Sequence, residues 1–353
     1  MAIRIQIIIG YQDRIHFTRH PTSNRDTNDI NQFNCLGSIQ KKKNLFKLSL
    51  TSLTDHILMK FTVCITGEKM TLKQLERKEL IRGMCGIGPK ALSMEKKISD
   101  PVNNQFIVDD TQKIIYCFIP KVACSNWKRV MFVLKKGKPY DDPSSISKTS
   151  VHEFSKLRYL TQFNSTERKW RMMNYTKFMF VRDPFVCLIS AYRSKFLYKQ
   201  KNTYLYKNYG KIMIKRYKNQ PNPPQTLKEA EELGLLPTFN NFIQYLVDPQ
   251  TERREPFEPH WRQMYRLCHP CLIEYDFIGH QENLQEDAQE LLKLLKLEND
   301  IKFPSAYENV TTSNSVMDWF KTVPLEDRRK LFDIYKWDFK LFGYKRPDSL
   351  LDG

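Results

Sequence analysis

Two short segments of the chain combine side chains and spacings that suit anion binding. The first, Pro120 to Asn126, follows the β-branched and aromatic run Lys113 to Ile119 and leads into a helical pattern from Ser125 to Leu134. A strand, a tight loop and a helix in this order direct backbone N–H groups and a helix N-terminus toward one point, which a lysine at the start of the loop can also reach. The segment lacks the G-x-x-x-x-G-K-[ST] pattern, so an ordinary turn between a strand and a helix is the alternative.

The second segment follows the predicted strand Thr176 to Val181. Arg182 comes directly after this strand, Pro184 suits the first turn of the helix predicted from Phe185 to Phe196, and Ser190 lies two turns into that helix. An arginine fork and a hydroxyl can grip a second phosphate. The alternative is structural, with Asp183 capping the helix and a solvated Arg182.

Two strand-loop-helix units in succession predict an α/β fold with a parallel, P-loop-like sheet flanked by helices. The carboxyl ends of parallel strands meet at one edge, where open α/β sheets bind their ligands. A nucleotide that carries phosphates at both ends of its ribose would need two such anion sites. Farther along, Asn283 to Leu297 and Pro324 to Phe342 have the apolar spacing of helices that pack on a core.

Length and composition set the domain organisation. The chain has 353 residues and is 41% hydrophobic, enough for one large core or two modest ones. Residues 1 to 100 lack sustained periodicity and are predicted to be a poorly patterned leader, possibly disordered, while residues 101 to 353 form the catalytic domain. The formal net charge of +18 favours a polyanionic partner without specifying which.

Cysteine and targeting signals are weaker. The eight cysteines are too dispersed for a small disulfide scaffold and leave the redox compartment open. Cys268 and Cys271 form a C-x-x-C without a second pair, so no metal site is predicted, and a disulfide with each other or with other cysteines remains open. No apolar run of about 18 residues or more marks a membrane span. Glycosylation sequons occur at Asn164, Asn174 and Asn309.

The two anion segments resemble the motifs of a known family, the Golgi carbohydrate sulfotransferases that include the chondroitin 4-O-sulfotransferases and the HNK-1 sulfotransferase. PKVACSNW, from Pro120, is similar to the family's 5'-phosphosulfate loop, and RDPFVCLIS, from Arg182, is similar to its 3'-phosphate motif. The resemblance covers about Phe106 to Leu350. Ser125 stands where the family more often has threonine, and Cys187 replaces a residue that is often arginine.

The resemblance implies the sulfotransferase fold, the donor 3'-phosphoadenosine 5'-phosphosulfate, no metal, and a lumenal catalytic domain on the Golgi membrane. It also implies a membrane anchor, which is not visible in this chain. Carried over by motif, the donor-binding residues are Pro120, Lys121, Val122, Ala123, Cys124, Ser125, Asn126, Arg182, Asp183, Pro184, Phe185, Val186, Cys187, Leu188, Ile189 and Ser190.

Sulfuryl transfer, like phosphoryl transfer, is an in-line displacement in which charge builds on the bridging oxygen of the leaving nucleotide. Lys121, supported by the backbone N–H groups of the loop, is expected to meet that charge. The acceptor hydroxyl needs a base. His152 is the first candidate because imidazole titrates near neutral pH, His260 is the second and Glu258 the third.

The expected acceptor is a chondroitin- or dermatan-type glycosaminoglycan, with sulfate placed on the 4-hydroxyl of N-acetylgalactosamine. Tyr198 to Tyr217 interleaves aromatic and basic residues that suit an acidic polysaccharide, although a solvated basic helix explains them equally well. Three alternatives are weighed: a basic nucleic-acid-binding module, a P-loop kinase, and a catalytically inactive homologue that binds glycosaminoglycan. The first leaves the paired anion loops unexplained, and the second lacks the glycine pattern and a magnesium-binding carboxylate. No nucleic-acid partner is therefore expected.

Overall fold

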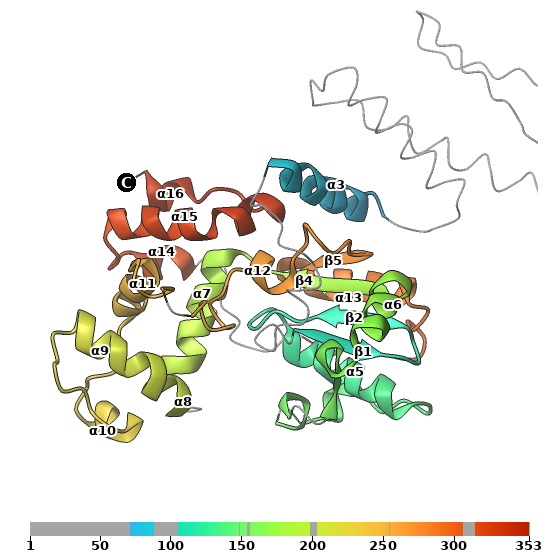
Figure 1. Ribbon diagram of the computed structural model, residues 1–353, viewed down its shortest axis with the longest axis horizontal. Coiled ribbons are helices and arrows are strands. Elements are labelled where there is room, and N and C mark those ends of the chain that lie inside the picture. The colour runs from blue at the N-terminus through green and yellow to red at the C-terminus, as the bar shows by residue number, and fades with distance from the viewer. Residues whose placement is uncertain are drawn as a thin grey trace, which may run out of the picture. The chain divides into compact units, whose positions relative to one another are not determined.

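The computed structural model describes residues 71–87, 105–147, 149–153, 156–197, 203–253, 255–305 and 315–352. A five-stranded sheet in the order β3-β1-β2-β4-β5 forms the centre (Figure 1). Its strands are β1 (Phe106–Asp109), β2 (Ile114–Cys117), β3 (Arg158–Tyr159), β4 (Thr176–Val181) and β5 (Phe277–His280).

Strands β2, β4 and β5 run parallel, and β1 pairs antiparallel with both β2 and β3. The predicted parallel α/β core is therefore confirmed, while one side of the sheet is an antiparallel extension. Strand β1 had no strong sequence signal. It is joined to β2 by a short turn, so the two strands pair as a hairpin rather than through a helical crossover.

The helices of the first half are α3 (Leu72–Ile87), α5 (Cys124–Lys136), α6 (Ser165–Asn174) and α7 (Pro184–Tyr192). Those of the second half are α8 (Thr203–Leu205), α9 (Lys211–Tyr217), α10 (Leu227–Glu232), α11 (Phe239–Val247), α12 (Met264–Cys268), α13 (Leu284–Leu294), α14 (Val316–Phe320), α15 (Leu325–Leu341) and α16 (Asp348–Leu351). Short 3-10 turns are η2 (Pro143–Ser145), η3 (Ser150–His152), η5 (Leu160–Gln162) and η8 (Gln281–Asn283), and π-helical turns are η6 (Arg193–Leu197) and η7 (Tyr206–Gly210).

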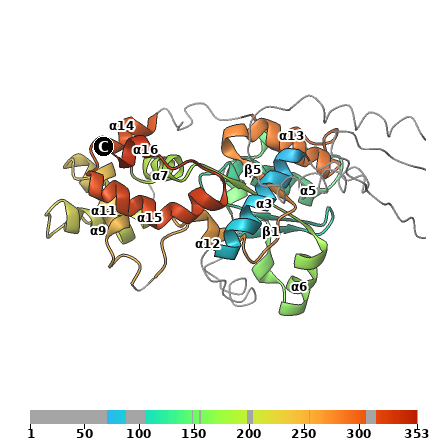
Figure 2. The same ribbon diagram turned by 90° about the horizontal axis from the view of Figure 1, so that it is seen from above.

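Two apolar clusters hold these elements together. The first surrounds the sheet and includes Trp127 of α5, whose ring lies 4.9 Å from that of Phe178 and 4.7 Å from that of Phe303. The second joins α7, α11, α14 and α15, which lie together in both Figure 1 and Figure 2, and its stacked pair Phe185 and Phe320 is 4.9 Å apart. Helix α7, which includes most of the second anion segment, is thus packed into the second apolar cluster.

Helix α3 lies in the stretch that the sequence analysis assigned to the leader, and the structure packs it beside β5. The side-chain amide of Gln74 accepts a hydrogen bond from Ile278 N at 3.0 Å and donates one to Ile278 O at 3.1 Å. An edge strand has backbone groups that no neighbouring strand pairs. The Gln74 amide makes the two hydrogen bonds that a neighbouring strand would make to Ile278, and in this way it covers the edge at β5. The other residues of the expected leader, 1–70 and 88–100, lie outside the described part of the chain.

Candidate functional site

The first anion segment connects β2 to α5 through a loop with unusual backbone geometry. Lys121 and Ala123 have positive φ angles of 69° and 45°, although neither is glycine. Left-handed residues that alternate with ordinary ones turn successive N–H groups toward one side of a loop and form an anion-binding concavity. The strain at such positions, of order 1–3 kcal/mol each, persists only where the surroundings enforce it, and it is concentrated at functional sites.

The surroundings of this loop are tightly fixed. Asn126 is 1% exposed, and its amide nitrogen lies 3.5 Å from Pro304 O and 3.4 Å from Ser305 O. Trp127 is fully buried in the cluster around the sheet. These anchors lie in the first turn of α5, so the first N–H groups of the helix, which lack partners within the helix, stay directed at the loop.

The second anion segment begins where β4 ends. Asp183 caps α7, and its Oδ1 accepts hydrogen bonds from Phe185 N at 2.9 Å and Val186 N at 3.0 Å. Pro184 occupies the first helical position, as predicted. The structural role that the sequence left open for Asp183 is therefore present in the fold, and it fixes the start of the helix that carries Ser190.

Arg182, by contrast, is not solvated. It is 4% exposed, and its Nη1 donates a hydrogen bond to Lys121 O at 3.0 Å. Strands β2 and β4 are adjacent and parallel, so the two loops that follow them emerge at the same edge of the sheet. Burial lowers the pKa of Arg182, but an arginine remains charged under all ordinary conditions. A buried cation thus joins the two anion loops directly.

The remaining residues of the second segment differ in burial. The side chains of Phe185, Val186, Leu188 and Ile189 are buried, whereas Ser190 is partly exposed. The sulfur of Cys187 lies 3.8 Å from Pro120 O, and burial raises the pKa of this thiol to about 12. The apolar residues accordingly hold α7 in place, and the Ser190 hydroxyl is left at the surface of the helix.

Two of the three candidate bases lie next to these loops in different ways. His152, in η3, is exposed, and its Nε2 forms a 2.9 Å hydrogen bond with Ser125 Oγ of the first loop. His260 lines a small pocket together with Pro184 and Cys187. The third candidate, Glu258, is hydrogen bonded to His260, so these two candidates lie side by side.

Sequence reasoning missed several residues that complete this edge of the sheet. Glu282, which follows β5, accepts hydrogen bonds from Asp183 N at 2.9 Å and from the Tyr344 hydroxyl at 2.9 Å. The ring of His280 lies 5.2 Å from that of Tyr344. Their only sequence signal was that the chain near them resembles the family, because no local pattern brings residues 183, 282 and 344 together.

The basic and aromatic segment, which runs from residue 198 to 217, is described from Thr203 onward. It forms α8, η7 and α9, on which Tyr204 is 63% exposed and Lys207 and Lys215 are also exposed. Tyr206 and Ile214 point inward. Half of the segment is therefore core and half is a basic surface that also displays an aromatic ring.

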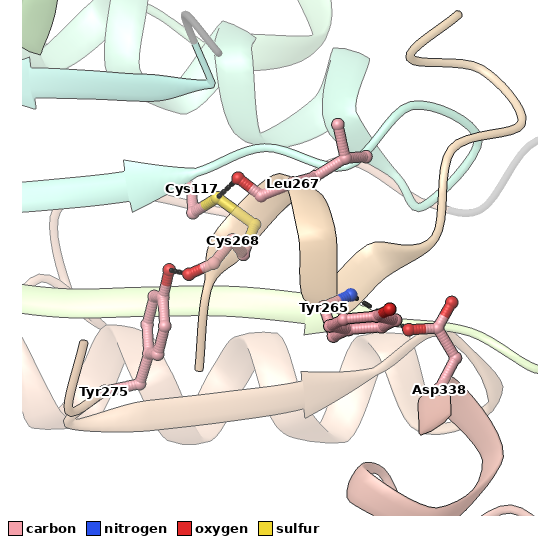
Figure 3. The surroundings of a disulfide bond; sticks show 6 residues. All are labelled: Cys117, Tyr265, Leu267, Cys268, Tyr275 and Asp338. Atoms are coloured by element: carbon pink, nitrogen blue, oxygen red, sulfur yellow. Dashed lines mark hydrogen bonds between the residues drawn. A yellow bond between two sulfur atoms is a disulfide. The ribbon is translucent and has the colours of Figure 1, made fainter. Parts of the chain in front are cut away.

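The C-x-x-C motif is divided between two disulfides. Cys268 pairs with Cys117 and Cys271 pairs with Cys85, over sequence separations of 151 and 186 residues. Figure 3 shows the first of these bonds, with the Tyr275 hydroxyl donating to Cys268 O at 2.6 Å and Asp338 accepting from Tyr265 N at 2.9 Å. The bond joins the end of β2, just before the first loop, to the end of α12.

Within the described residues, no cluster of three or more His, Cys, Asp or Glu residues could hold a metal ion. No helix there is both long and apolar enough to cross a membrane. Asn164 and Asn174 are exposed at the two ends of α6, whereas Asn309 lies outside the described residues.

A parallel sheet core with two joined loops at the carboxyl ends of adjacent strands is an α/β architecture in which ligands commonly bind at that edge of the sheet. Consistent with this class, the family model described as "Sulfotransferase family" matches residues 104–345. The chain therefore belongs to the sulfotransferase family.

Among curated proteins, carbohydrate sulfotransferase 12 of Mus musculus is 45% identical over 295 residues, which cover 79% of this chain and 70% of the relative. Carbohydrate sulfotransferase 12 of Xenopus laevis has the same identity and coverage. Carbohydrate sulfotransferase 11 of Rattus norvegicus is 37% identical over 276 residues, covering 78% and 76% of the two chains. No solved structure is significantly similar to this chain.

Proposed function

We propose that this protein transfers sulfate from 3'-phosphoadenosine 5'-phosphosulfate to a carbohydrate hydroxyl. The observation that carries the proposal is the buried Arg182, which joins the loop after β4 to the backbone of Lys121 in the loop after β2. Two anion loops held at a fixed separation suit a donor with phosphate groups at both ends of its ribose. Membership of the sulfotransferase family supports the same donor.

The residues present fit this donor. The left-handed backbone at Lys121 and Ala123 and the N-terminus of α5 offer N–H groups to the 5'-phosphosulfate, and Arg182 with Ser190 suits the 3'-phosphate. When bound, the donor supplies an activated sulfuryl group attached to a phosphate leaving group. Lys121 stabilises the negative charge on that leaving oxygen, and His152 or His260 accepts the proton of the acceptor hydroxyl.

For the acceptor, we infer a chondroitin- or dermatan-type chain that receives sulfate on the 4-hydroxyl of N-acetylgalactosamine. Carbohydrate sulfotransferases 12 and 11, to which the chain is similar, support a carbohydrate acceptor by their names. The motifs of the sequence resemble those of the chondroitin 4-O-sulfotransferases. The exposed Tyr204, Lys207 and Lys215 supply a ring for sugar contacts and cations for uronate carboxylates.

We place the catalytic domain in the lumen of the Golgi apparatus, attached to its membrane. The disulfides Cys85–Cys271 and Cys117–Cys268 support this compartment because such bonds form and persist in oxidising surroundings. The cytosol would keep these thiols reduced.

The test is transfer of labelled sulfate from the donor to unsulfated chondroitin by the full chain, followed by disaccharide analysis. Lys121→Ala and Arg182→Ala are run beside it, with the exposed Lys321→Ala, outside the basic segment, as a matched control for loss of a cation. The expected result is label in 4-sulfated disaccharides with the wild type and the control, and a loss of at least about 100-fold in rate with both loop variants.

The alternatives give different results. An inactive homologue that binds glycosaminoglycan would bind donor and chondroitin without transferring label to chondroitin, dermatan or N-glycan acceptors. A nucleic-acid-binding module would bind neither the donor nor the polysaccharide selectively, and would prefer nucleic acid at equal ionic strength. Either result would overturn the proposed function.

A further inference from the structure

Glu258 and His260 form a hydrogen-bonded pair. His260 Nδ1 lies 2.8 Å from Glu258 Oε1 and 3.0 Å from Oε2, and Glu258 Oε2 also accepts a hydrogen bond from His260 N at 2.7 Å. The turn is closed by Trp261 N and Arg262 N, which both donate to Glu258 O at 3.0 Å. Backbone and side chain together therefore fix the carboxylate beside the ring.

This contact sets the tautomer of the imidazole. An ionised carboxylate only accepts hydrogen bonds, so Nδ1 must carry the hydrogen that points at Glu258. In the neutral ring, Nε2 is then the nitrogen with a free lone pair. Within the described part of the chain, Nε2 of His260 makes no hydrogen bond to protein, and the side chain is 26% exposed. It is therefore open to a ligand.

The pair faces the donor loops. His260 lines a pocket with Pro184 and Cys187 of α7, and Cys187 contacts Pro120 of the first loop. Burial lowers the pKa of His260, the contact with Glu258 opposes that shift, and the positive charges of Lys195 and Lys121 lower the pKa further. Asp338 of α15 and Arg262 line the same pocket. The net lowering of the pKa favours the neutral ring, and Lys121 is close enough to influence it.

The other candidate base has a different environment. His152 is exposed and uses Nε2 for its bond to Ser125 of the donor loop. Its geometry suits holding that loop, whereas a base needs its acceptor nitrogen directed at the incoming hydroxyl.

Resting on the proposed function, we propose that Glu258 is a positioning residue that holds His260 with its proton on Nδ1, so that His260 Nε2 is the general base for the acceptor hydroxyl. In the transfer step, the new bond forms between the acceptor oxygen and sulfur as the bond between sulfur and the bridging phosphate oxygen breaks. The hydroxyl proton moves to Nε2, Glu258 stabilises the imidazolium, and the proton then leaves to solvent.

The test compares Glu258→Gln, Glu258→Asp, His260→Ala and the double variant Glu258→Gln/His260→Ala in the full chain. The exposed Glu326→Gln on α15 is the control for the same chemical change. Sulfate transfer to chondroitin gives kcat, KM and the pH profile of kcat/KM, calorimetry with 3'-phosphoadenosine 5'-phosphate gives donor-site affinity, and thermal unfolding reports folding.

The expected result is a fall in kcat of about 100- to 10,000-fold for Glu258→Gln, with donor-site affinity changed less than about threefold. An amide can donate to Nδ1 and favours the wrong tautomer, whereas Glu258→Asp keeps the carboxylate and recovers part of kcat. The acid limb of the pH profile should shift to lower pH in Glu258→Gln, because the imidazolium loses its anion. The double variant should be no slower than His260→Ala.

Three results would overturn the assignment: kcat of Glu258→Gln within about threefold of wild type, a double variant clearly slower than His260→Ala, or an unshifted acid limb. If Glu258→Gln does not fold, the kcat and the pH profile of Glu258→Asp test the assignment in its place. Failure of the wild type to transfer sulfate at all is a separate result, which refutes the proposed function itself.

Discussion

The roles proposed for Lys121 and Arg182 depend on backbone contacts as much as on charge. The left-handed conformation of Lys121 turns its carbonyl toward Arg182, which buries a guanidinium between the two loops. A guanidinium has several donors in a fixed plane, so one can hold Lys121 O while others remain for a phosphate. A lysine ammonium has its three donors on a single nitrogen and cannot present them as a planar fork to both partners.

We therefore expect Arg182→Lys to weaken binding of 3'-phosphoadenosine 5'-phosphate by about 10- to 100-fold although the charge is kept, because a hydrogen bond to a charged group contributes about 1.5–3 kcal/mol. Isothermal titration calorimetry measures the affinity. Arg216→Lys, an exposed substitution of the same kind, should leave it unchanged. Equal affinities for Arg182→Lys and wild type would show that only charge matters at this position.

Asn164 and Asn174 differ as glycan acceptors. Asn164 uses Oδ1 to accept from Glu167 N at 2.9 Å, whereas the Asn174 amide nitrogen donates to Trp170 O at 2.7 Å. A glycan bonds the amide nitrogen, so the cap at Asn164 survives modification and the bond at Asn174 is disturbed. Secreted expression followed by glycosidase treatment and peptide mapping should find Asn164 occupied to a greater extent than Asn174. The reverse occupancy would contradict this reasoning.

Among the elements, helix α3 matters because its side chains hydrogen bond the backbone of the edge strand β5. Besides Gln74, its Arg77 donates to Ile278 O at 2.7 Å and to Asp287 at 2.8 Å. Gln74→Ala removes the acceptor of the buried Ile278 N, while Arg77 still donates to Ile278 O, and we expect a loss of about 1–3 kcal/mol in the free energy of unfolding. Chemical denaturation measures it against Glu76→Ala, an exposed change on the same helix. Equal stability of the two variants would contradict the hypothesis that Gln74 of α3 stabilises the edge of the sheet.

The disulfide Cys117–Cys268 links two elements that are far apart in sequence. Replacing both cysteines by alanine should lower the free energy of unfolding by about 2–5 kcal/mol, because the unfolded chain gains the freedom of a long loop. Thermal or chemical unfolding of the double variant is compared with Cys124→Ala, which removes a free thiol. A change of equal size in both would show that the bond does not restrain this fold.

Over the whole molecule, two buried groups give stability opposite dependences on pH. Burial raises the pKa of Asp338 to about 7, despite the hydrogen bonds from Met264 N and Tyr265 N, and lowers that of His280 to about 3. Between pH 4 and pH 6.5 the native state therefore binds one proton more than the unfolded chain at Asp338 and one fewer at His280. The two contributions to the slope of stability with pH cancel in this window.

Single variants should expose each contribution. Removing His280 by His280→Gln leaves Asp338 alone, and stability should then fall, relative to wild type, as pH rises from about 4 to about 7, with a slope of about 1.4 kcal/mol per pH unit. Asp338→Asn should produce the opposite relative slope, with stability falling as pH drops below about 6.5. Urea denaturation across this range provides the measurement. Parallel curves for all three proteins would mean that neither group titrates as its burial requires.

Local pattern was enough to predict the units that build the site. A run of β-branched and aromatic residues followed by a helical repeat predicted β2 with α5 and β4 with α7, because strand, turn and helix signals act over a few residues. The sequence also predicted helices at α13 and α15. The hairpin strand β1 and the two-residue β3 were missed, since such short pairings depend on a neighbour that is already in place.

Relations between distant residues needed the tertiary structure. The sequence identified Lys121, Arg182, His152 and His260 as site candidates by residue type and by motif, and the grouping of these residues remained a prediction. Packing decided that Arg182 is buried against Lys121 O, that His260 lines one pocket with Pro184 and Cys187, and that the C-x-x-C cysteines pair elsewhere. Chemical groups are encoded locally, but contacts over 60 to 200 residues arise only when strand order and burial bring them together.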